Sequence, residues 1–488
     1  MGKCEIIELT QKLFFRTTIK ERRFYNEARI KTTRKEAREH LEQFQLACEL
    51  FKLIRHFFPD LLPLLKRLPD PRHQSYITYP GVVLLMTRIL SSLFYISSMR
   101  KTSEEFNSDT MIENIWMLSG EKPTADEIPY WETINRYLAK VEPEGLQEIV
   151  HQLCRRLLRS RAFENARIRG KYWQVIIDGT QLYSTRKELD GKSLYRIHNR
   201  GTQEEYRENY YYVLEAKLVL HPKILISIQT EFVDNEDGEE TGKQDCERKA
   251  CWRLMKKIKK AFPRLNICFS GDSLYACEKF FEMCKKEGWR YILRFKEGSI
   301  PTIAGEYRKL KEVEKNYQEH VRENGKEWYD FVEDIDYNGY KINLAEYGES
   351  ETYTYKKGKK KGISEERRKK FWFLTDLPLS KKNIRKLVER GRMRWKIENG
   401  GFNNQKNHGY HLGHRYSQKY QGIKNHYYLI QIGHMIAQIL EAWEKIWENS
   451  RQSMEQKHKR LLESVKETKL REHREALEKR IQIRLMPI

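Results

Sequence analysis

Two short apolar runs in the middle of the chain each lead to an aspartate. Residues 172–177 are followed directly by Asp178, and residues 265–269 are followed by Ser270, Gly271 and Asp272. Such runs predict buried strands, and a strand end holds the next side chain rigidly at the edge of a sheet. Because helical patterns lie between these runs, we expect a mixed α/β sheet flanked by helices.

A third acid, Glu398, lies in a helix-like stretch further along the chain. Three carboxylates brought together repel one another unless divalent cations lie between them. We therefore expect Asp178, Asp272 and Glu398 to hold two Mg²⁺ or Mn²⁺ ions, about 3.5–4 Å apart, in a site for phosphoryl transfer. The alternative for each acid is a structural cap, because Asp178-Gly179 and Gly271-Asp272 both suit turns.

The charge of the chain indicates a polyanionic partner. Its 488 residues include 92 Lys and Arg against 69 Asp and Glu, a net charge of +23, and 12% are aromatic. Basic and aromatic side chains together favour nucleic acid, although ordinary solubilising charge is the alternative. The eight cysteines form no Cys-x-x-Cys pair. We read them as reduced thiols of a cytoplasmic protein, and we expect neither a signal peptide nor a membrane span.

Changes in the pattern of apolar and polar residues divide the chain into five regions. We expect a helical region, a first part of the catalytic core, a polar β-rich insertion, a second part of the core with the third acid, and a helical end. Their limits are 1–165, 166–299, 300–370, 371–430 and 431–488.

Arg394 is the leading candidate for a DNA phosphate contact. It precedes Glu398 by one helical turn and shares its face, while Trp395 and Ile397 offer burial that would anchor the turn. The alternative is an ordinary surface ion pair. Further candidates for DNA contact are Arg294, Lys296, Trp328, Lys356, Lys357, Lys359, Lys360 and Lys361. Trp328 would stack on a base or serve as a core residue, and the lysines would track phosphates or form a solvated loop.

Two other groups suggest metal ligands more weakly. His408, His411 and His414 are spaced by three, but no fourth zinc ligand has an obvious spacing. Asp245 and Glu247 open a helix, where they favour its dipole or serve as peripheral ligands.

Taken together, the three acidic segments resemble the DDE transposases of bacterial insertion sequences, from about residue 125 to 430. One subgroup carries its third acid in the motif Tyr-x2-Arg-x3-Glu-x6-Lys, with Trp commonly after the Arg. Arg394, Trp395, Ile397 and Glu398 match this pattern. Gly391 replaces the Tyr and Gln405 replaces the Lys, so that Lys406 could take the role of the Lys only with a register shift.

The resemblance implies an RNase H-like core with a β-rich insertion before the third acid. It also implies metal-dependent cleavage of double-stranded DNA at transposon ends, followed by attack of the freed 3′-hydroxyl on target DNA, without a covalent intermediate. Because two ends are processed together, we expect a homodimer. The same reaction implies that the helical region 1–165 binds the DNA ends and that the helical region 431–488 could make dimer contacts. The alternatives are an RNase H-like nuclease without strand transfer and a non-catalytic DNA-binding relative, which the departures at Gly391 and Gln405 keep open.

Overall fold

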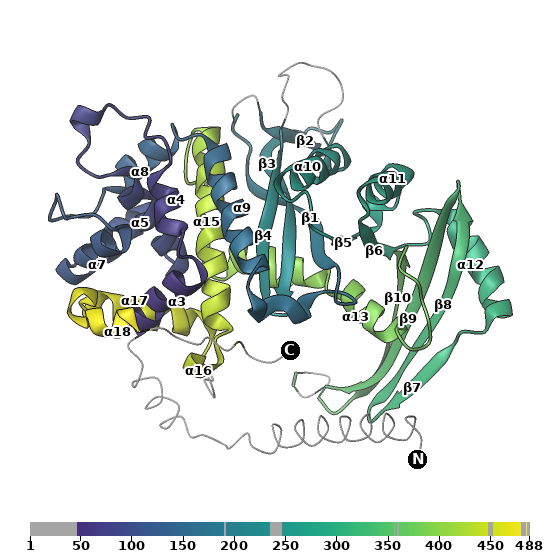
Figure 1. Ribbon diagram of the computed structural model, residues 1–488. Coiled ribbons are helices and arrows are strands. Elements are labelled where there is room, and N and C mark those ends of the chain that lie inside the picture. Colours follow the sequence, from purple (N-terminus) through teal and green to yellow (C-terminus); the bar gives the residue numbers. More distant parts are fainter. Residues whose placement is uncertain are drawn as a thin grey trace, which may run out of the picture.

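The computed structural model describes residues 46–189, 192–234, 246–355, 357–358, 361–447, 452–479 and 485. Within them a ten-stranded sheet runs through the molecule, with a helical body at one side and a long-stranded hairpin region at the other (Figure 1). The strands are β1 (Trp173–Thr185), β2 (Leu194–His198), β3 (Tyr206–His221), β4 (Ile224–Val233), β5 (Ile267–Gly271), β6 (Arg290–Phe295), β7 (Gln318–Arg322), β8 (Gly325–Tyr337), β9 (Tyr340–Thr354) and β10 (Ser364–Thr375).

The centre of the sheet is mixed, as predicted. β4, β3 and β1 are antiparallel neighbours, and β5 and β6 continue the sheet parallel to β1. β3 and β4 form the predicted hairpin around the turn at residues 221–223. This antiparallel and parallel arrangement, with helices on both sides, confirms the predicted α/β fold class.

Alternate residues of β1 enter two different hydrophobic cores. Val175 and Ile177 pack in the main core, which also contains residues of α10 (Glu247–Ala261). Ile176, between them, packs with Ile397 and Phe402 in a separate cluster. Since side chains alternate across a strand, α10 and the segment around residue 397 cover opposite faces of the sheet.

The inserted segment extends the core sheet. β10 pairs antiparallel with β6, placing Phe373 opposite Arg294, and then pairs with β9 along its whole length. The helix α12 (Pro301–Glu314) packs on β8, and β7 is the outer strand. The β-rich insertion is therefore hydrogen-bonded to the core, with one helix of its own.

Helices from both ends of the described chain form one body. They are α3 (Leu46–Phe57), α4 (Leu61–Lys66), α5 (Gly81–Leu93), α6 (Met99–Glu105), α7 (Asp109–Ser119), α8 (Trp131–Leu138), α9 (Pro143–Leu158), α15 (Tyr420–Glu441), α16 (Glu444–Trp447), α17 (Met454–Glu467) and α18 (Arg474–Glu478). The long helix α15 lies between α5, α9 and β4, while α17 and α18 pack on α3. The surfaces expected to make dimer contacts are thus partly used within the chain, and the limits of the five regions stay a prediction.

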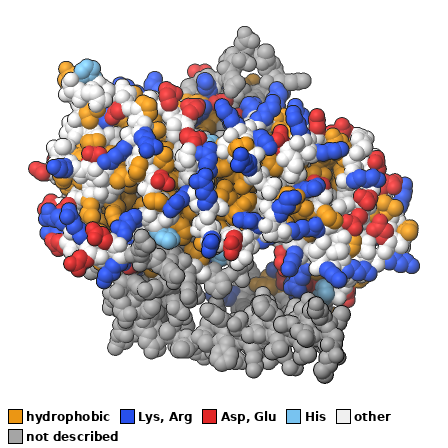
Figure 2. Space-filling model, in the orientation of Figure 1, with side chains coloured by type: hydrophobic (Ala, Val, Ile, Leu, Met, Phe, Trp, Pro, Cys, Tyr) orange, Lys and Arg blue, Asp and Glu red, His pale blue; other side chains and the backbone are white. Residues whose placement is uncertain are grey.

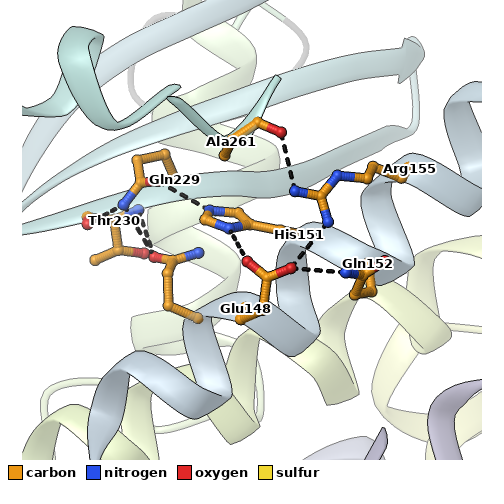
Figure 3. A network of polar contacts seen from close by, with 8 residues as sticks. Glu148, His151, Gln152, Arg155, Gln229, Thr230 and Ala261 are labelled. Atoms are coloured by element: carbon orange, nitrogen blue, oxygen red, sulfur yellow. Dashed lines mark hydrogen bonds and ion pairs between the residues drawn. The ribbon is translucent and has the colours of Figure 1, made fainter. Parts of the chain in front are cut away.

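A polar network docks this helical body on the edge of the sheet (Figure 3). His151 of α9 lies 3.1 Å from Glu148 and 2.9 Å from the side-chain oxygen of Gln229 on β4. Arg155 donates a 2.9 Å hydrogen bond to the carbonyl of Ala261, at the end of α10. These contacts give α9 a fixed register against β4, beyond what apolar packing alone would specify.

Candidate active site

Asp178 lies within β1, and not at a strand end as predicted. β1 continues to Thr185 because the residues after Asp178 pair with the long strand β3. Its parallel neighbour β5 stops earlier, so the pairing of β1 with β5 ends at Ile176 opposite Ser270. Asp178 is therefore at the point where β1 loses its neighbour on one side, and its side chain is 19% exposed.

Asp272 directly follows β5, as predicted. Because Ile176 is opposite Ser270, Asp178 and Asp272 each lie two residues further along adjacent parallel strands. Its carboxylate accepts a 2.8 Å hydrogen bond from the backbone N–H of Leu274 and caps a short helical turn. In the described structure Asp272 thus has the structural role that we set out as the alternative, beside the backbone of Asp178.

Glu398 and Asp178 meet at one guanidinium. Arg394 donates a 2.8 Å hydrogen bond to Glu398 and lies 3.5 Å from Asp178. Glu398 is in a π-helical segment, Ile397–Asn403, which follows α13 (Ile384–Arg392). π-Helical turns are rare and occur often at functional sites.

The anchoring of this turn was predicted only in part. Ile397 is fully buried against Ile176, whereas Trp395 is 51% exposed and cannot anchor the turn by burial. Trp395 therefore leaves an aromatic surface available next to Arg394.

The electrostatics of Asp178 indicate a site that needs positive charge. Burial is the main cause that raises the pKa of Asp178 to about 7; the nearby carboxylates of Glu398 and Glu247 add to it, and Arg394 acts in the opposite direction. A buried acid with a strongly raised pKa among other acids is a common feature of functional sites. Arg394 supplies only one positive charge to this group.

Glu247 is a neighbour of the site whose environment the sequence did not reveal. Its two carboxylate oxygens accept hydrogen bonds from the hydroxyls of Tyr212, at 2.7 Å, and Tyr275, at 2.5 Å. The ring of Tyr212 lies over Gly179, next to Asp178, and the ring of Tyr275 lies over Gly271, next to Asp272. A Cβ at Gly179 would come within 2.2 Å of the Tyr212 hydroxyl, and one at Gly271 within 2.6 Å of Tyr275. The Asp-Gly and Gly-Asp pairs thus leave room for rings that hold Glu247.

A complete metal centre is not assembled among the described residues, where no three Asp, Glu, His or Cys side chains are arranged to hold an ion. The chemistry of the donors nevertheless fits a hard divalent cation, because Asp178 and Glu398 share one cation and Asp272 lies on the adjacent strand.

The two departures from the resembled motif have structural explanations. A Cβ at Gly391 would come within 2.5 Å of the ring of Phe373, so β10 fills the space that a side chain there would need. Gln405 is fully buried and donates to Gln431 at 2.8 Å. Gln405 therefore cannot contact DNA in this arrangement, and Gly391 has no side chain with which to do so. Lys406, next in sequence, is partly buried, and burial lowers the pKa of its amine.

A cavity of about 320 Å³ adjoins Arg394. Its lining residues are Arg294, Lys369, Phe371, Phe373, Gly391, Arg392, Arg394 and Trp395. Arg294 is held in place by a 2.9 Å hydrogen bond to the carbonyl of Trp372, and its guanidinium lies 4.8 Å from the centre of the Phe371 ring. Arg294 and Arg394, both predicted to contact DNA, are thus brought to one cavity with cationic and aromatic walls.

The other predicted DNA contacts are not brought to this site. Trp328 lies across Gly348, on the sheet face where Glu346 accepts a hydrogen bond from α12. The opposite face carries Tyr347, which contacts Arg392, so Trp328 points away from that face. Lys296 is exposed just after β6. Lys357 and Lys361 are exposed at the tip of the β9–β10 hairpin, roughly 40 Å along the strand from Phe373. Asp245, Lys356, Lys359 and Lys360 lie outside the described residues.

The histidine group does not form a zinc site within the described chain. His414 packs edge-on against Tyr416, and His408 lies 3.4 Å from Asn403. Lysine and arginine side chains are spread over the face seen in Figure 2, with hydrophobic side chains visible between them. Across the described residues, no helix combines the length and the apolar character needed to cross a bilayer.

Comparisons with known proteins agree with these observations. A family model described as "Transposase DDE domain" matches residues 169–436, more than half of the chain. No curated protein matches. A solved structure, "Cryo-EM structure of piggyBac transposase synaptic complex with hairpin DNA", aligns over 88% of this chain and 82% of its own, at 10% identity and a TM-score of 0.38, too low to support a structural comparison. From the family match, which spans β1, β5 and the π-helical segment, the chain belongs to the transposase DDE domain family.

Proposed function

We propose that this chain is a DNA transposase that cuts double-stranded DNA at transposon ends and joins the freed 3′-hydroxyl to target DNA. One observation carries the proposal. Asp178 and Glu398, 220 positions apart in the sequence, converge on the guanidinium of Arg394. The family match supplies the reaction class, and the charge of +23 fits a DNA partner.

Asp178, Asp272 and Glu398 would hold two Mg²⁺ or Mn²⁺ ions. When bound, such ions would supply positive charge to the phosphodiester and lower the pKa of the attacking water or hydroxyl. The raised pKa of Asp178 and the single cation at the site support this assignment. Glu247, whose two oxygens accept hydrogen bonds from tyrosine hydroxyls, would add a further negative charge beside the ions.

Arg394 would bind the phosphate that is cut or the phosphate next to it. A guanidinium matches the geometry of a phosphate, and Arg394 already lies between the two acids. The adjoining cavity adds Arg294, Arg392 and Lys369 as further cations and three aromatic rings as stacking surfaces. This combination suits one DNA strand entering beside the acids. Lys406 remains a weaker candidate, as do the exposed lysines of the β9–β10 hairpin.

The test uses a labelled duplex carrying the repeats that flank the coding region, with Mg²⁺ or Mn²⁺. Asp178→Asn, Asp272→Asn and Glu398→Gln should each abolish cleavage and leave DNA binding largely intact, because each removes one metal donor. Glu282→Gln removes an exposed acid from α11 (Glu278–Glu287) and should behave as wild type. Full activity of any of the three variants would remove that residue from the site.

The products distinguish the alternatives. Joined DNA supports a transposase, cleavage without joining supports a nuclease, and binding without cleavage supports a non-catalytic relative. Because two ends must be processed together, we also propose a homodimer on paired ends, which the mass of the DNA complex in solution would show.

A further inference from the structure

A second cationic cavity lies on the other side of α13. Its volume is about 500 Å³, and its walls come from the turn before β1, from the ends of β6 and β10, and from α13. The buried side chains of Ile168, Ile292 and Leu377 line it, together with Leu387. The cavity thus has an apolar side and, above it, charged groups from two separate segments.

Four cations surround this cavity: Arg167, Arg169, Lys386 and Arg390. The one acid in its lining, Glu389, pairs with Arg385 at 3.4 Å. Within the described part of the chain, none of the four cations forms an ion pair. Like charges gathered without counter-charges cost free energy unless an anion joins them.

Two of the cations are held in place by the fold. Arg167 lies 5.2 Å from the centre of the Trp173 ring, and its Nε atom is buried without a hydrogen-bond partner. Arg169 has a left-handed backbone, with φ of 53°, and its guanidinium donates to the carbonyl of Pro378. Burial lowers the pKa of Arg390, so its charge would be favoured by a bound anion. Arg169 and Gly170 both have positive φ, as in a tight hairpin turn, and this turn fixes the backbone from which Arg169 reaches the cavity.

We propose that this cavity binds a backbone phosphate of the same DNA duplex, with the attached sugar against its apolar side. The inference rests on the proposed function for its ligand. The cations of α13, Lys386 and Arg390, precede Arg394 by eight and four residues, so they lie roughly 6–12 Å from it along the helix, and the turn at Gly170 forms the far wall of the cavity. That length corresponds to roughly two to four base pairs of B-form DNA. Residues of α13 line the second cavity, and the residues that end this helix and follow it line the first, so a duplex lying along the helix would reach both.

The first experiment measures how salt weakens DNA binding. Each lost phosphate contact should reduce the slope of log K against log salt by about 0.9, measured between about 50 mM and 200 mM salt. Lys386→Gln and Arg390→Gln should each reduce the slope by this amount, whereas Lys382→Gln, which removes one exposed charge just before α13 and outside the cavity lining, should change it little. Equal effects of all three variants, or no effect of Lys386→Gln and Arg390→Gln, would overturn the inference.

The length of the DNA gives a second, independent readout. Duplexes that extend about ten base pairs beyond the cleavage position on the bound side should show the effect of Lys386→Gln, and duplexes that end about one base pair beyond it should not. Both sides of the cleavage position are tested. If the effect persists on the short duplexes of both sides, the cavity does not hold DNA at this distance.

Chemical protection locates the contact directly. Lys386 is exposed, so acetylation by an activated ester should modify it in the free protein and modify it less in the DNA complex. Lys381 and Lys382, exposed just before α13, serve as controls. Protection by pyrophosphate but not by DNA would overturn the DNA assignment in favour of a small anion. All three readouts use DNA binding, so they stand even if the Asp178→Asn test shows no catalysis.

Discussion

The helices α15 and α13 both pack on the sheet, but their polar side chains differ in whether they have partners within the protein. Asn425, His426, Gln431, His434 and Gln438 of α15 are buried, and each has a hydrogen-bond partner within the chain. Lys386 and Arg390 of α13 line a cavity and, in the part of the chain that the structure describes, form no ion pair. Polar groups that hold the fold are satisfied inside it, while those that await a ligand are not.

The largest effect should come from breaking the satisfied network. Glu215 is fully buried under α15, and accepts hydrogen bonds from Ser227, Thr230 and Tyr427. Glu215→Ala would leave these three hydroxyls and the buried Lys217 without their acceptor or counter-charge. We expect a loss of about 3–5 kcal/mol in the free energy of unfolding, measured by chemical denaturation. A loss below that of the exposed variant Glu282→Gln would contradict this description of α15.

Arg394 should show the opposite behaviour, with a large effect on activity. Arg394→Gln removes the cation shared by Asp178 and Glu398 and the proposed phosphate contact. We expect the cleavage rate to fall by about 100-fold, as for the loss of one charge-stabilising donor in an active site, while the melting temperature changes little. Single-turnover kinetics with labelled DNA would measure the rate, with Arg385→Gln as the control. If melting falls sharply, Arg394 belongs with the structural groups.

The pH dependence of stability tests the state of Asp178. Its folded pKa of about 7 is above that of an unfolded aspartate, so the folded state binds the proton more tightly. Stability from this group is therefore present at low pH and is lost as pH rises from about 4 through 7. Without metal, we expect about 2 kcal/mol to be lost between about pH 5.5 and 7.5.

The comparison of wild type with Asp178→Asn isolates this contribution, because other buried acids such as Glu215 also have raised pKa values and remain in both proteins. Added Mg²⁺ should reduce the loss in wild type and have less effect in the variant. Identical pH curves for the two proteins would show that the pKa of Asp178 is the same in the folded and unfolded states.

The smallest effect is expected on α13. Arg390→Gln removes a partly buried charge that has no ion-pair partner in the described chain, so the melting temperature should stay the same or rise slightly. Differential scanning calorimetry without DNA measures this. A clear fall would show that Arg390 stabilises the fold, and would weaken the contrast with α15.

The sequence predicted the features that depend on neighbours in the chain. Apolar runs located β1 and β5, and helical spacing placed Arg394 beside Glu398. Features that depend on distant partners were not visible. β1 extends past Asp178 because β3 is long enough to pair with it, and Gln405 is buried because α15 covers it. The tyrosines that bond Glu247 come from two other elements, and only their packing over Gly179 and Gly271 reveals them.

The cavities were hidden for the same reason. Phe371 and Phe373 reach Arg394 only because β10 pairs with β6, and Arg167 reaches α13 only through the turn before β1. Loop and strand pairings over long sequence separations determine such surfaces, and periodicity within one segment does not encode them.

The pairing of β10 with β6 has a mechanical consequence. β10 runs as one strand from the hairpin tip to Thr375, and only its end, from Trp372 to Thr375, is hydrogen-bonded to β6 beside Arg294. A force on the tip would therefore be transmitted along β10 to β6. Such a force would displace β6 and, with it, Arg294 in the cavity that Arg394 also lines. DNA gripped far from the acids could in this way adjust the alignment of the strand to be cut.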